Sequence, residues 1–166
     1  MNDEERREAI RRSGITIAID GPAGSGKSTI SKLLATRLGI GYLDTGAMYR
    51  SLTWYALEQG LDLDDHESVV EAANRMPLVM TPDPVSPSYF VDGVEITRAI
   101  REPRIALAIP AVSTNLLVRK WMAFEQRRRM MEARESGSGM IAEGRDITTV
   151  VCPDADVRVL LLADEE

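Results

Sequence analysis

The sequence has very little cysteine and histidine, with one residue of each among 166. The single cysteine, Cys152, excludes an internal disulfide, which is consistent with a reducing cytoplasm. The only histidine, His66, stands beside Asp64 and Asp65, with no second histidine or cysteine nearby. We therefore expect His66 at the surface and no metal site built from histidine or cysteine.

Long apolar runs and an excess of positive charge are also missing. No stretch of about eighteen apolar residues occurs, so no membrane span is expected. Residues 1–12 are charged and lack the apolar segment of a secretory signal, so a cytoplasmic location is expected. The net charge of −6 disfavours a nucleic-acid-binding surface. The remaining composition, 44% hydrophobic and 28% charged, is typical of a globular domain with its own core.

A glycine-rich segment at residues 21–29, GPAGSGKST, follows directly after the apolar run Ile15–Ile19. It matches the phosphate-binding loop G-x-x-x-x-G-K-[ST] at every fixed position; an ordinary glycine-rich turn is the alternative. In such a loop, backbone N–H groups and the start of a helix surround a triphosphate. Lys27 would reach the β- and γ-phosphates, and the hydroxyl of Ser28 would ligate Mg²⁺. The predicted nucleotide-binding residues are Gly21, Pro22, Ala23, Gly24, Ser25, Gly26, Lys27, Ser28 and Thr29.

Strands and helices alternate along the chain. Apolar runs predict buried strands at 15–19, 140–142 and 158–162, and helical spacing predicts helices over 27–38, 47–59 and about 104–135, the last either continuous or broken once. Residues 2–12 are expected to form a frayed helix or a tail. Between 77 and 98, prolines separate β-prone pieces, and Asp92-Gly93 between two such pieces predicts a hairpin. The predicted fold class is α/β: a parallel sheet flanked by helices, with a small antiparallel β insert.

Three blocks resemble the bacterial cytidylate kinase family and occur in that family's order. They are residues 19–29 (IDGPAGSGKST), 42–50 (YLDTGAMYR) and 143–151 (EGRDITTVV). The resemblance covers residues 14–163. It implies a P-loop NTPase-type kinase domain at 14–166, with a nucleoside-monophosphate-binding insert at about 62–103, after a charged extension at 1–13. Family members continue past the position of Glu166 with an arginine-rich lid. The resemblance therefore implies a C-terminally truncated member that binds ATP weakly and turns over slowly.

The resemblance also implies a reaction and its site. ATP would donate its γ-phosphate to CMP or dCMP, giving CDP or dCDP in pyrimidine nucleotide metabolism, with Mg²⁺ as cofactor. Lys27 and Arg145 would be the catalytic residues. The residues assigned to CMP are Thr45, Arg50, Arg119, Arg145 and Asp146. Arginine suits a phosphate because its guanidinium forms two parallel hydrogen bonds. No general base is needed, because a phosphomonoester loses its second proton at a pKa of about 6. We expect a monomer whose partners are nucleotides rather than nucleic acid or a membrane.

Two positions depart from the family pattern. Thr148 follows Arg-Asp-Ile where the family usually has glycine, which would be costly if that backbone needs a positive φ. Pro110 stands where the family usually has a serine that contacts the base, and Ser113, one helical turn further on, is a candidate replacement. CMP or dCMP preference and tolerance of UMP stay open.

The residues leave further alternatives. Arg145 and Asp146 could form a structural ion pair instead of a binding site. The chain could be a non-catalytic ATP-binding fragment or a subdomain of a longer polypeptide instead of a kinase. Another small-metabolite kinase on the same core is a third alternative, which the block DTGAMYR at 44–50 disfavours. The run Arg127–Arg129 is expected to be a solvated helix face, and Cys152 to be packed rather than nucleophilic.

Overall fold

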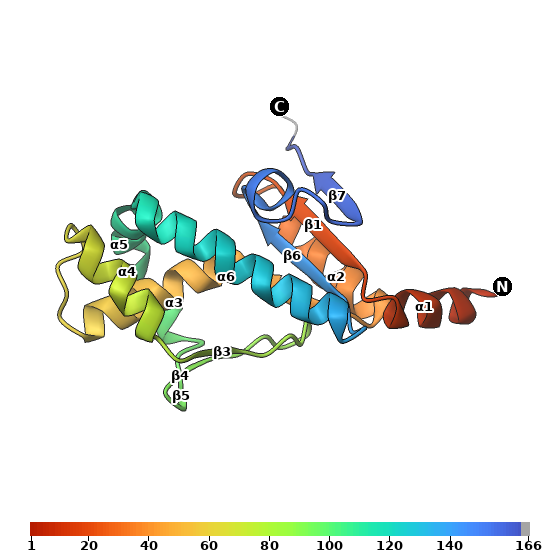
Figure 1. Ribbon diagram of the computed structural model, residues 1–166, viewed down its shortest axis with the longest axis horizontal. Helices are drawn as coiled ribbons and strands as arrows, with labels where there is room; N and C mark the ends of the chain where they lie inside the picture. Colours follow the sequence, from red (N-terminus) through yellow and green to blue (C-terminus); the bar gives the residue numbers. More distant parts are fainter. Residues whose placement is uncertain (164–166) are drawn as a thin grey trace. The chain divides into compact units, whose positions relative to one another are not determined.

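The structure, a computed structural model, describes residues 1–163 and divides into two compact units (Figure 1). Of the described residues, the first unit comprises 1–45, 82–86 and 126–163, and the second comprises 46–81 and 87–125. The first unit contains a parallel sheet, and the second combines helices with a small antiparallel sheet. The predicted α/β class is thereby confirmed.

The parallel sheet of the first unit has four strands in the order β2-β6-β1-β7. They are β1 (Thr16–Asp20), β2 (Gly41–Asp44), β6 (Met140–Gly144) and β7 (Val157–Leu160). β1 is buried along its whole length and pairs with both β6 and β7, as expected for an apolar strand at the centre of a parallel sheet. The prediction missed β2, and it placed β7 slightly too late.

Helix α2 (Lys27–Leu38) packs on this sheet. The shared core consists of Ile17, Ile19, Ala35, Ile40, Tyr42 and Ile141. Gly39 ends the helix with a φ of 68°, as predicted. Upstream, α1 (Asp3–Arg12) begins at a reciprocal cap in which Asn2 and Glu5 exchange hydrogen bonds of 2.8 Å. The N-terminal segment is therefore a capped helix.

The connections in the sheet define where a ligand would bind. The chain leaves β1, passes through α2 and reaches β2 on the far side of β6. It leaves β6, passes through the π-helical turn η2 (Ile147–Val151) and reaches β7 on the far side of β1. The two connections thus run in opposite directions, and in open α/β sheets ligands bind outside the carboxyl ends of the strands at such a switch point.

The second unit contains the predicted hairpin. Its sheet has the order β3-β4-β5, with strands β3 (Leu78–Met80), β4 (Tyr89–Val91) and β5 (Val94–Glu95). Asp92 and Gly93 have φ values of 51° and 77°, which suit a two-residue turn that needs positive φ at both positions. The short helix η1 (Ala99–Arg101) follows.

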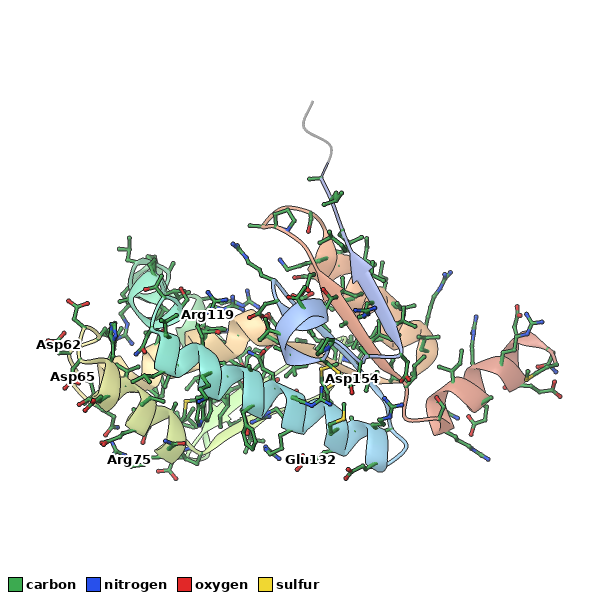
Figure 2. The ribbon with its side chains drawn as sticks, turned by 45° about the horizontal axis from the view of Figure 1, so that its top comes forward. Asp62, Asp65, Arg75, Arg119, Glu132 and Asp154 are labelled. Atoms are coloured by element: carbon green, nitrogen blue, oxygen red, sulfur yellow. The ribbon has the colours of Figure 1, made fainter. Side chains whose placement is uncertain are left out.

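This unit contains α4 (His66–Arg75), α5 (Pro103–Ser113) and all of α3 (Thr45–Glu58) except its first residue. The long helix α6 (Leu116–Glu135) begins in this unit, and its residues 126–135 belong to the first. The long helical stretch is broken once, because Asn115 accepts hydrogen bonds from the backbone N–H groups of Leu117 and Val118 and so starts α6. α4 was not predicted. Asp65, labelled in Figure 2, caps it through the N–H of Ser68, and His66 is exposed as predicted.

No helix within residues 1–163 is long and apolar enough to cross a membrane.

Candidate phosphate-binding site

The glycine-rich loop has the predicted context, with β1 before it and α2 after it. Gly24 and Gly26 have φ values of 78° and 81°, which a side chain would make costly. Gly26 is the N-cap of α2 and has no side chain with which to cap the helix. Its position leaves the first N–H groups of α2 without a capping side chain, and the positive end of the helix dipole suits an anion. Lys27 is the first residue of α2.

Ser28, the loop residue expected to ligate Mg²⁺, contacts a buried carboxylate on β6. The hydroxyl of Ser28 donates a hydrogen bond of 2.6 Å to Oε1 of Glu143. Glu143 is only 3% exposed, and its Oε2 accepts no hydrogen bond within the described part of the chain. Glu143 was not among the residues predicted to bind a ligand.

The environment of Glu143 favours its neutral form. Burial raises the pKa of this carboxyl above its usual range, and the neighbouring charge of Asp44 adds to the effect. The hydrogen bond from Ser28, the charge of Lys27 and the nearby Tyr42 hydroxyl act in the opposite direction without cancelling the rise. Glu143 is thus a carboxylate that would gain from a nearby cation.

A divalent cation fits this donor set. Mg²⁺ prefers oxygen ligands and is held by one or two protein groups together with phosphate oxygens and water. The Ser28 hydroxyl and the free Oε2 of Glu143 provide two such oxygens. Within residues 1–163, no cluster of three or more His, Cys, Asp or Glu side chains could hold a metal by itself.

Thr45, predicted to bind CMP, directly follows β2 as the first residue of α3 and is only 4% exposed. Its hydroxyl donates a 2.7 Å hydrogen bond to the carbonyl oxygen of Glu143. A Cβ atom at Gly144 would lie 2.5 Å from this hydroxyl oxygen, so glycine is required for the close approach of β2 to the end of β6. The hydroxyl proton of Thr45 is already engaged, which leaves an acceptor role toward a ligand.

Arg145 and Asp146 follow β6 directly, at the carboxyl end of the sheet. The side chain of Arg145 is exposed and forms neither an ion pair nor a hydrogen bond with any residue of the described chain. The alternative of a structural ion pair between Arg145 and Asp146 is therefore not found. Arg145 is a cation in the same unit as the phosphate-binding loop.

Thr148 does not adopt the positive φ that would make a threonine costly at this position. Asp92 is the one non-glycine residue with positive φ among residues 1–163, so Thr148 adopts ordinary backbone geometry. Its hydroxyl donates a hydrogen bond of 2.6 Å to Asp20.

The other predicted CMP-binding residues belong to the second unit. Arg50 is half-buried on α3, and Arg119 is exposed on α6 (Figure 2). Pro110 lies inside α5, and Ser113 is the last residue of that helix. Their convergence with Arg145 and Asp146 on one CMP molecule stays a prediction.

The arginine run at 127–129 lies at the helix surface, with Arg128 exposed and Arg127 and Arg129 half-exposed, and Arg127 also pairs with a neighbouring segment. Arg127 makes two hydrogen bonds to the carboxylate of Asp154, of 2.6 and 2.9 Å, and one of 3.3 Å to the carbonyl oxygen of Val151. Cys152 is fully buried, and burial raises the pKa of its thiol. It is packed, as expected, and not poised as a nucleophile.

A surface cavity of about 450 Å³ lies between α1 and the last turn of α2, at the opposite end of α2 from Lys27. Its charged lining is balanced: Asp3, Glu4, Glu8, Arg7, Arg11 and Arg37. This balance selects no ligand of either sign.

Comparison with known proteins decides the family. The model of the family described as "Cytidylate kinase" matches residues 17–166. The chain belongs to the cytidylate kinase family. It is 42% identical to a cytidylate kinase of Streptomyces griseus over 93% of this chain and 66% of that protein. It is 45% identical to a cytidylate kinase of Limosilactobacillus fermentum over 90% of this chain and 64% of that protein.

Family members also occur inside larger polypeptides. A bifunctional pantoate ligase/cytidylate kinase of Synechococcus sp. is 45% identical over 89% of this chain and 29% of that protein. The chain thus spans about two thirds of the length of the single-function relatives and under a third of the bifunctional one.

Proposed function

We propose that this protein is a nucleoside monophosphate kinase that transfers the γ-phosphate of ATP to CMP or dCMP, giving ADP and CDP or dCDP. One observation carries the proposal. The phosphate-binding loop, the Ser28–Glu143 pair and the unpaired cation Arg145 all belong to the carboxyl ends of β1 and β6 in a single unit. The family match and the relatives' names, cytidylate kinase, favour CMP as the acceptor.

The residues divide into a donor set and an acceptor set. Lys27 and the backbone N–H groups of 21–29 bind the phosphates of ATP, and Lys27 stabilises charge on the transferred group. Arg145, together with Arg50, binds the acceptor phosphate. Arg119 and Asp146 contact the cytosine, and Thr45 accepts a hydrogen bond from the acceptor nucleotide.

Ser28 and Glu143 would hold Mg²⁺, which supplies positive charge that neutralises the phosphate oxygens. Before nucleotide binds, the Ser28 hydroxyl donates a hydrogen bond to Oε1 of Glu143, so the two oxygens are already close together. The acceptor phosphate is already ionised at neutral pH, so no residue has to remove a proton. The chemistry then consists of aligning two anions and balancing their charge.

We further propose that the protein is a monomer. We also propose that it works in the cytoplasm, where its nucleotide substrates would be found. Neither nucleic acid nor a membrane is required as a partner.

A coupled assay of ADP release with ATP and each of CMP, dCMP, UMP and AMP tests the proposal. We expect release that depends on CMP or dCMP and exceeds the rate with ATP alone. Equal release with and without every monophosphate would reject the kinase. MgATP binding without any CMP-dependent release would instead support a non-catalytic ATP-binding fragment or a subdomain of a longer polypeptide.

A further inference from the structure

Asp20, the last residue of β1, is buried and accepts three hydrogen bonds from one short segment. Its Oδ1 accepts from the backbone N–H of Ile147 at 2.9 Å. Its Oδ2 accepts from the backbone N–H of Thr148 at 2.8 Å and from the hydroxyl of Thr148 at 2.6 Å. Asp20 is 2% exposed. A buried carboxylate is tolerated only when such donors replace the lost water.

The donors belong to the π-helical turn η2 (Ile147–Val151). π-helical turns are rare in proteins, and those that occur often lie at functional sites. The first N–H groups of any helical turn have no acceptor within it, and no residue next to η2 caps it through a side chain. Asp20 therefore caps η2 from another strand.

This cap joins two parts of the candidate site. Asp20 directly precedes Gly21, the first residue of the phosphate-binding loop, and Ile147 directly follows Asp146. The backbone N–H of Gly21 also donates a hydrogen bond of 3.3 Å to the carbonyl oxygen of Gly144. The short segment Arg145–Asp146 is thus bounded on both sides by contacts to the end of β1.

We propose that Asp20 and Thr148 are positioning residues that fix Arg145 and Asp146 relative to the ATP phosphates. The inference rests on the proposed function, since it assigns the acceptor phosphate to Arg145. Thr148 contributes a side-chain hydrogen bond to Asp20 that a glycine could not form. With glycine at this position the backbone N–H bond would remain, and the shortest of the three bonds, from the hydroxyl, would be absent.

Thr148→Val removes the hydroxyl and keeps the β-branched shape. Loss of one such bond, of about 0.5–1.5 kcal/mol, should raise the Kd and KM for CMP about 2- to 10-fold and leave ATP affinity within about 2-fold. Thr148→Ser should restore CMP affinity. Thr149→Val is the matched control, because the Thr149 hydroxyl is 3.5 Å from its nearest acceptor, the carbonyl oxygen of Asp146, and the residue is exposed.

Hydrogen exchange gives a readout that does not depend on nucleotides. The amides of Ile147 and Thr148 should exchange faster in Thr148→Val than in the wild type and in Thr149→Val. Asp20→Asn places an N–H donor opposite the donors of η2. It should therefore speed the exchange of these amides and weaken CMP binding more than Thr148→Val does. The melting temperature (Tm) of each variant is recorded to exclude unfolding.

The outcomes distinguish the positioning role of Asp20 and Thr148 from the proposed kinase function. If the wild type binds CMP and Thr148→Val matches it in exchange and in CMP affinity, the positioning role is overturned. Faster exchange with a proportional loss of both ATP and CMP affinity would also overturn it, because that result means general loosening. If the wild type shows no CMP binding at all, the proposed function fails and the positioning role fails with it, whatever the exchange data show.

Discussion

Ser28 and Glu143 are joined by a hydrogen bond of 2.6 Å between the Ser28 hydroxyl and Oε1 of Glu143. The bond connects the residue after the loop lysine to a buried carboxylate whose other oxygen, Oε2, lacks a partner in the described chain. Such a carboxylate is unfavourable for folding and favourable for cation binding.

Glu143→Gln should stabilise the nucleotide-free protein at neutral pH. The folded-state pKa of Glu143 lies above the ordinary value of 4.5, so between these two values the folded protein holds a proton that the unfolded chain has released. Stability therefore falls as pH rises through this window. The glutamine does not titrate, so its advantage in Tm should grow from pH 4 to pH 8, to about 2–4 °C for roughly 1 kcal/mol. Thermal unfolding over this pH range measures it.

The same substitution should weaken Mg²⁺-dependent binding. The Tm increase produced by MgATP should shrink in Glu143→Gln, while the smaller increase from ATP in excess EDTA should stay the same. A Tm difference that does not change with pH, together with an unaltered MgATP effect, would contradict both roles of Glu143.

Lys27→Ala should reduce CMP-dependent turnover by on the order of 10²-fold or more, because it removes a preorganised charge from the transferred phosphate. Lys32→Ala is the control on the same helix. Lys32 lies outside the loop 21–29, and its ammonium group is 5.7 Å from the centre of the Tyr42 ring. Steady-state kinetics of both variants decide the matter, and near-normal turnover in Lys27→Ala would reject the donor-site assignment.

Local patterns were sufficient to predict the loop, β1, α2 and the hairpin, since each depends on neighbours in sequence. Strand β2 was missed because its four residues include a glycine and an aspartate, and its structure comes from pairing with the distant β6. Helix α4 had a readable signal that was overlooked: the Asp65 cap followed by the buried series Val69, Ala72 and Ala73.

The chemistry of the site was harder to predict than its loop. The motif identified Ser28, and nothing local pointed to Glu143, which lies 115 residues further along the chain. Likewise, the partners of Asp20 lie 127 and 128 residues away. A single sequence records such pairings only through the fold, so residues that act through long-range contacts stay invisible to motif analysis.

Arg127→Met should lower Tm by roughly 1–3 °C near neutral pH, as expected for a surface ion pair with two parallel bonds. Arg127 depresses the pKa of Asp154 well below its ordinary value of 3.8. The pair therefore stabilises the fold fully above pH 3.8, and its contribution declines as pH falls below that value. Thermal unfolding from pH 3 to pH 7 should show the gap to wild type narrowing only at the acid end.

Arg128→Met is the control for this test, because Arg128 pairs with Glu132 on its own helix, an arrangement that contributes less. If the Arg128 variant lost as much Tm as the Arg127 variant, helix propensity rather than the Asp154 pair would explain the effect.

Arg145→Met and Asp146→Ala should separate phosphate recognition from base recognition. Loss of a charged hydrogen-bonding group should weaken CMP and UMP about equally in Arg145→Met, by about 10- to 100-fold, and leave cytidine unaffected because it has no phosphate. Asp146→Ala should reduce the preference for CMP over UMP more than it weakens phosphate binding. Calorimetric titration of each variant with CMP, UMP and cytidine measures these effects.

Arg158→Met supplies the control, because Arg158 is also an exposed arginine of the first unit and lies on β7 rather than at the site. It should bind all three ligands as the wild type does. Equal losses for CMP, UMP and cytidine in both site variants would mean that Arg145 and Asp146 maintain the local fold instead of recognising the nucleotide. The exposure of Arg145 argues against that outcome, since an exposed side chain without a hydrogen bond or ion pair to any described residue contributes little to the local fold.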